Sequence, residues 1–149
     1  MDKKIEASIL NEPQRRGLSA TFITLEEMMY EIETVINSGG YRGSLLEIDN
    51  DISPQAKEEV LKRIRLIREK ISRLSKQFSL EMKQMKSSRQ IFADLSYCWE
   101  ILEGSKAKKL RGYGEVAEGL KEILDPQINT IIDLITDMEN LIKIGRAHV

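Results

Sequence analysis

The chain has little of what metal, redox or covalent chemistry requires: one cysteine, Cys98, and one histidine, His148, in 149 residues. A single cysteine excludes an internal disulfide framework. His148 belongs to a terminal segment treated below as non-native, which leaves Cys98 without a histidine to activate it. We interpret Cys98 as a buried structural thiol. We therefore predict no catalytic residue, no metal ligand and no cofactor, and an enzyme is the least supported class of function.

Long apolar runs are also absent. No stretch approaches the roughly 18 uncharged apolar residues of a membrane span, and the first residues lack the apolar core and cleavage site of a signal peptide. We expect no association with a membrane and a cytoplasmic location. Only three prolines, with 41% hydrophobic and 32% charged residues, indicate a globular and helix-rich protein.

The stretch 53–78 has the clearest helical pattern. Ser53 can cap a helix whose first position is Pro54, where the missing N–H costs nothing. Apolar residues then recur at alternating spacings of four and three, as expected of a helix packed against near-parallel neighbours. They are Val60, Ile64, Ile67, Ile71, Leu74 and Phe78. The pattern predicts one helix with one buried face.

The same spacing recurs on both sides of this stretch and predicts three further helices, at about 11–37, 81–103 and 115–143. In the last helix, Asp125-Pro126 repeats the cap of Ser53-Pro54 and predicts a break. The buried stripe expected after that break comprises Ile128, Ile131, Ile135, Met138 and Ile142. Four helices of this kind predict an all-α fold, an antiparallel four-helix-bundle-like domain over residues 1–142. The alternative is one long helix over 53–103, because the stripe of 53–78 continues past Phe78 with no glycine or proline to interrupt it.

The last residues fit no part of this fold. Ile144-Gly145-Arg146-Ala147-His148-Val149 is what a widely used short-read sequencing adapter encodes, and the adapter's next codon is a stop. The adapter also requires the codon of residue 143 to end in AG, which Lys143 satisfies. Our hypothesis is that 143–149 is an adapter-derived tail, with residue 143 partly determined by it, and that the natural sequence is truncated here. Different codons in the source nucleotide sequence would refute it.

The loop between the third and fourth predicted helices is rich in basic residues. Possible anion-binding residues in it are Lys106, Lys108, Lys109, Arg111 and Tyr113. Gly112, Gly114 and Ala117 match the spacing of a dinucleotide fingerprint, but no strand precedes them, so we reject that site. An ordinary connector whose lysines complement a helix dipole is the simpler interpretation of the loop.

Charge is distributed unevenly along the chain. Residues 1–36 carry four basic and seven acidic side chains, whereas 53–78 carry eight basic and three acidic ones. We favour neutralisation of basic helices by acidic ones over recognition of an anionic partner.

Our leading hypothesis is therefore a non-enzymatic helical interaction or scaffold module. It either self-associates as a homo-oligomer or forms a coiled coil with a helical partner. The alternative is a binder of anionic ligands or of a nucleic-acid backbone, through the basic loop 106–111 and the basic faces of the middle helices.

Overall fold

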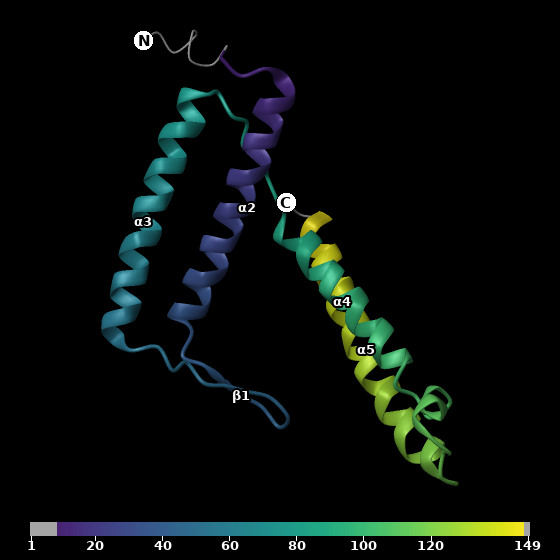
Figure 1. The fold of residues 1–149 in the computed structure, drawn as a ribbon. Coiled ribbons are helices and arrows are strands. Elements are labelled where there is room, and N and C mark those ends of the chain that lie inside the picture. The colour runs from purple at the N-terminus through teal and green to yellow at the C-terminus, as the bar shows by residue number, and fades with distance from the viewer. Residues whose placement is uncertain (1–8, 148–149) are drawn as a thin grey trace. The chain divides into compact units, whose positions relative to one another are not determined.

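A computed structural model describes residues 9–147 and gives this part of the chain an all-α fold with one small β-ribbon, which confirms the predicted fold class. The chain divides into two compact units, Met1–Lys83 and Gln84–Val149. Each unit is built around an antiparallel helical hairpin (Figure 1). The predicted single domain over 1–142 stays a prediction.

The first unit contains α2 (Glu12–Asn37) and α3 (Pro54–Gln77), close to the predicted bounds. Between them, β1 (Tyr41–Arg42) pairs with the antiparallel strand β2 (Glu47–Ile48). Neither strand was predicted. The core lies between the helices, where Ile36, Ile64 and Ile71 are buried as their stripes predicted. Two residues of strand on each side leave too short a pattern to be recognised in a sequence.

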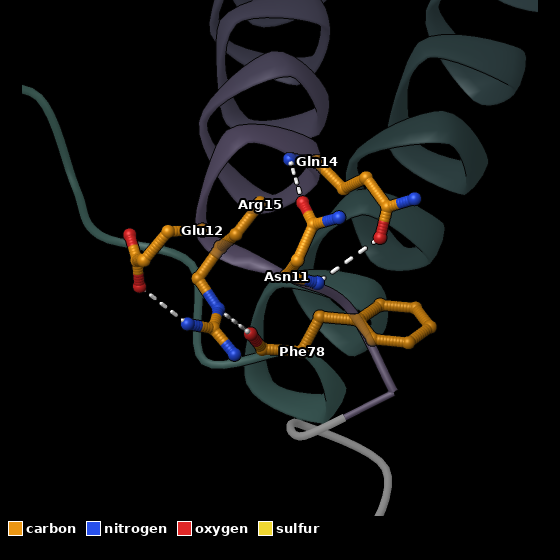
Figure 2. Close-up of polar contacts among 5 residues, drawn as sticks. All are labelled: Asn11, Glu12, Gln14, Arg15 and Phe78. Carbon is orange, nitrogen blue, oxygen red and sulfur yellow. Dashed lines mark hydrogen bonds and ion pairs between the residues drawn. The ribbon is translucent and has the colours of Figure 1, made fainter.

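The start of α2 is held by a reciprocal cap (Figure 2). The backbone N–H of Gln14 donates to Asn11 Oδ1 at 2.8 Å, and the Asn11 N–H donates to Gln14 Oε1 at 3.0 Å. Arg15 then reaches the other helix, because its Nε donates to the carbonyl oxygen of Phe78 at 3.2 Å. The beginning of α2 therefore lies level with the end of α3, which sets the register of the hairpin.

The opposite end of the hairpin is held by Asn50. Its amide donates to the carbonyl oxygens of Val35, Ile36 and Ser38, which lie at the end of α2. Carbonyl groups at a helix end have no partner within the helix, so this side chain supplies a C-terminal cap. The chain reaches Asn50 by way of Gly40, whose φ is 84° and where an added Cβ would lie 2.7 Å from the Ile48 carbonyl oxygen. Only glycine fits there without a shift of the backbone.

The alternative of one helix over 53–103 is wrong. Ser79 takes a left-handed conformation, with φ of 53°, and the Leu80 N–H donates back to the Ser75 carbonyl oxygen at 2.8 Å. This is the hydrogen bond of a Schellman motif, which ends a helix. Residues 80–86 are not helical, and α4 (Ser87–Glu103) begins six residues later than the predicted start at 81. A connection of this length replaces the tight turn that a closed hairpin of the two middle helices would need.

The second unit contains α4, the short 3-10 helix η1 (Lys109–Tyr113) and α5 (Leu120–Ala147). Its buried apolar residues are Leu95, Ala107, Ile128 and Ile132. The last helix begins at Leu120 and not at 115, because Gly114 and Gly119 have φ of 142° and 87°, which no right-handed helix allows.

The predicted break at Asp125-Pro126 is also wrong, since α5 continues through Pro126. A proline inside a helix costs one backbone hydrogen bond, and two buried isoleucines in the next turns keep the helix packed. Of the predicted stripe, Ile128 is buried and Ile135 and Ile142 are half-buried, whereas Ile131 and Met138 are exposed and Ile132 is buried instead. Residues 143–147 of the proposed tail continue α5, and His148 and Val149 lie outside the described residues.

Candidate functional site

The predicted anion-binding residues lie on and beside η1. Lys106 forms an ion pair with Glu103, with Nζ and Oε1 3.1 Å apart, so its charge is partly neutralised. Tyr113 is 91% exposed and does not line the pocket beside η1. Lys109 is exposed as well. These three residues do not line the pocket that contains the other two predicted residues.

Lys108 and Arg111 do lie together, on an open hollow of about 600 Å³. Lys121, from the first turn of α5, is the third basic residue of its lining, and Glu115 is the acidic one. None of these three cations forms an ion pair within residues 9–147. Sequence reasoning missed Lys121 because the predicted helix over 115–143 placed it inside a helix and not at a helix start beside the loop.

The hollow is positioned by Ala107 and Asp125. The Ala107 N–H is buried and donates to Asp125 Oδ1 at 2.9 Å, which ties the connector to α5. Asp125, predicted as a helix cap, serves as this acceptor instead. Cations around an open hollow can bind a phosphate or carboxylate group, but the carboxylate of Glu115 on the same wall opposes an anion.

Apolar side chains form a second kind of surface in the first unit, which we call the first apolar face. It comprises the exposed residues Met28, Ile32 and Val35 of α2 and Val60 of α3, together with the half-buried Ile67 of α3. Met28 is 53% and Val35 57% exposed, although another face of the same helix is buried against α3. The sequence pattern had already placed Val60 and Ile67 on an apolar stripe, and it did not indicate that Val60 would remain exposed.

The position of this face follows from the helix geometry. At about 100° per residue, Met28 and Ile32 lie on one side of the line of contact of α2, and Glu33 on the other. Val60 and Ile67 likewise lie across the line of contact of α3 from Arg68. Because Glu33 and Arg68 form an ion pair with each other, they mark one side of the hairpin, and the apolar residues of both helices share the opposite side.

A second apolar face lies on the hairpin of α4 and α5. It comprises Ile101, Ile131, Leu134, Met138 and Leu141, all of them exposed, with Leu141 at 67%. The other side of this hairpin is polar, because Ser96, Thr136 and Glu139 line a pocket there with Trp99. Cys98, expected to be buried, is only partly covered.

The described residues include no group of acidic, histidine or cysteine side chains arranged to hold a metal ion. Within the same part of the chain, no helix combines the length and the apolar character needed to cross a membrane. No protein-family model matches the chain, and no curated protein or solved structure matches it either.

Proposed function

We propose that this chain is a helical interaction module that self-associates through an uncovered apolar side of a helical hairpin. The observation that supports the proposal is that exposed apolar side chains from both helices gather on one side of each hairpin, although Tyr30, Leu66 and Trp99 are exposed elsewhere. Isolated surface apolar residues are ordinary in monomeric proteins. A contiguous apolar side extending over two helices is characteristic of an interaction surface.

The physical reason lies in the geometry of two-helix packing. A helix with a wide apolar stripe can cover only part of it against a single neighbour, so a hairpin leaves one side of both helices in water. Burying apolar surface stabilises an assembly by roughly 25 cal/mol per Å². Further helices laid on that side therefore lower the free energy, as they do in a four-helix bundle.

Sedimentation velocity of the purified chain over a hundredfold range of concentration tests the proposal. We expect the weight-average sedimentation coefficient to rise with concentration, or to stay at the value of a dimer throughout. A chain that sediments as a monomer at every concentration would refute self-association. Mean residue ellipticity at 222 nm, measured across the same range, shows whether the helices are formed in each sample.

A second candidate function is the binding of an anionic ligand in the hollow. It is supported by the convergence of Lys108, Arg111 and Lys121 on one wall. The probe is a labelled single-stranded oligonucleotide, with a duplex of the same sequence for comparison, titrated at low and moderate salt. Such binding depends on counterion release, so we expect it to weaken steeply as salt is added.

The chain offers a matched control for this titration. Lys108→Glu and Arg111→Glu remove cations that line the hollow, whereas Lys109→Glu makes the same charge change in η1 outside the lining. We expect the first two variants to lose at least tenfold in affinity, and the third to lose much less. Equal losses in all three would mean that net charge alone drives binding, and absence of binding at low salt would end this candidate.

A further inference from the structure

We propose that the first apolar face binds the same face of a second copy, in a four-helix bundle whose twofold axis runs parallel to the helices. In this arrangement α2 of each copy packs against α3 of the other. The inference rests on the proposed self-association and specifies its surface and symmetry. The observations that support it are the opposite charges of α2 and α3 and the register of the hairpin that they form.

The two helices carry opposite charge. Between Glu12 and Asn37, α2 has two basic and five acidic residues, whereas α3 has eight basic and three acidic residues between Pro54 and Gln77. A second copy therefore presents a basic helix for the acidic α2 and an acidic helix for the basic α3. The second apolar face has no such match, because α4 and the described side chains of α5 both carry more acidic than basic residues.

Charge also selects the symmetry of the dimer. Two hairpins can meet face to face around a twofold axis that lies in the interface, either along the helices or across them. An axis across the helices would place α2 on α2 and α3 on α3, with like charges opposed. An axis along the helices places each acidic helix between two basic ones, and every neighbouring pair is antiparallel. Like-charge juxtaposition is unfavourable at an interface, so the dimer with its axis along the helices is preferred.

The register of the hairpin predicts which residues meet. The contact of Arg15 with Phe78 and the ion pair of Glu33 with Arg68 fix which levels of α2 and α3 face each other within one chain. Rotation about an axis parallel to the helices leaves those levels unchanged. At that register Val35 lies within about one helical turn of Val60 of the second copy.

At the rim of the same interface, Glu31 lies near Arg63 of the second copy. Glu31 has no ion pair within residues 9–147, and Arg63 holds only Glu59 of its own helix, at 2.6 Å and in an exposed position.

The face is large enough for a specific dimer. The 24 residues of α3 rise roughly 1.5 Å each, and packed helices lie about 8–10 Å apart, so two helices present on the order of 650 Å². Two such faces bury on the order of 1,300 Å², which is the size of a standard protein interface. A contact confined to one helix would bury about half as much.

Disulfide trapping in the chain of 149 residues tests the arrangement. In a Cys98→Ala background, Val35→Cys and Val60→Cys are made in separate chains, which are mixed and oxidised. Both valines are exposed and similar in size to cysteine, so folding should be retained. We expect a cross-linked dimer from the mixture and little from either chain alone. Met28→Cys alone serves as the comparison, because Met28 lies near the middle of the apolar stripe of α2 and would meet itself if α2 packed on α2.

The possible outcomes distinguish the symmetry of the dimer, the choice of face and self-association itself. Cross-linking of Met28→Cys with none in the valine mixture would overturn the proposed symmetry. A dimer in sedimentation with neither cross-link would overturn the choice of this face. In both cases self-association itself would stand. A monomer at every concentration would overturn the proposed function together with this inference.

Charge reversal gives a second measurement that does not depend on cysteine. Glu31→Lys and Arg63→Glu each place like charges at two symmetry-related positions of the dimer, and exposed pairs of this kind change the dissociation constant by between about twofold and thirtyfold in total. We expect each variant alone to dimerise more weakly and the mixture of the two to recover. Under packing of α2 on α2, Glu31→Lys would relieve repulsion between two acidic helices and strengthen the dimer, which would contradict the proposal.

Discussion

Ser79 shows how one residue decides the course of the chain. Helix propensity and the apolar stripe both allow α3 to continue, and Ser79 ends it by taking a left-handed conformation that supports the bond from Leu80 to Ser75. Residues other than glycine adopt this conformation at a cost of roughly 1–2 kcal/mol. The structure accepts that cost at the position where α3 ends and the connection to α4 begins.

We predict that Ser79→Gly stabilises the first unit. Glycine removes the strain of the left-handed conformation, and part of this gain is offset by its larger conformational entropy in the unfolded chain. The expected net gain is about 0.5 kcal/mol in the free energy of unfolding, measured by urea denaturation followed by circular dichroism. Ser72→Gly in the middle of α3 is the control and should lower stability by a similar amount. A loss of stability in both variants would contradict the assigned role of Ser79.

Several residues that hold the fold together could be predicted and others could not. Ser53 caps α3 as expected, because its side chain accepts from the Ala56 N–H at 3.1 Å, a contact between near neighbours in the chain. Asn50 acts across the loop, on carbonyl groups twelve to fifteen residues away. A local pattern can reveal the first kind of contact and gives no signal for the second.

At the scale of elements, the connector between α4 and α5 depends on a contact between its own backbone and the next helix. Ala107 is 2% exposed, so its N–H has no access to water and depends on Asp125 as acceptor. This hydrogen bond places η1 beside the start of α5. It also brings Lys108 and Arg111 of the connector to the same hollow as Lys121.

We predict that Asp125→Ala lowers the free energy of unfolding of the second unit by about 1–3 kcal/mol, the cost of a buried donor without an acceptor. Asp125→Asn keeps a carbonyl oxygen at this position and should lose well under half of that. Thermal denaturation of both variants, followed at 222 nm, measures the difference. Equal losses would mean that the negative charge of Asp125 matters and not its role as acceptor. A loss of nearly zero in both would mean that the hydrogen bond contributes little.

Helices with strong periodicity were predicted well, and their ends less well. The bounds of α2 and α3 differ from the prediction by at most one residue at each end, because caps and stripe agree there. The start of α5 was misplaced because two glycines with positive φ govern residues 114–119, and conformations of that kind are not encoded in apolar spacing. The sequence around Pro126 predicted a break that is absent, because packing of the neighbouring turns outweighs one lost hydrogen bond.

At the scale of the whole molecule, the candidate sites were only partly predictable. Two of the five predicted anion-binding residues, Lys108 and Arg111, line the hollow, and Lys121 completes it from outside the predicted loop. The apolar stripes were recognised in the sequence, but such a pattern does not show how many neighbouring helices cover it. That depends on the number of helices within reach, which is a property of the tertiary structure.

Polar substitutions made separately on each of the two apolar faces test which face mediates self-association. We predict that the double variant Met28→Gln and Ile32→Gln raises the dissociation constant of the dimer more than tenfold. It exchanges four apolar side chains of the dimer interface for polar ones, and burial of a full apolar side chain contributes about 1.5–3 kcal/mol.

The matched control is the double variant Ile131→Gln and Leu134→Gln, which makes the same kind of change on the second apolar face. Ile131 is 44% and Leu134 58% exposed, similar to the exposure of Met28 and Ile32, so both double variants should fold equally well. We expect its dissociation constant to stay within about threefold of the unchanged chain, as for surface positions outside an interface. Sedimentation equilibrium at three rotor speeds measures both constants. If the second variant dissociates and the first does not, then charge complementarity has selected the wrong face, and the dimer is formed by α4 and α5.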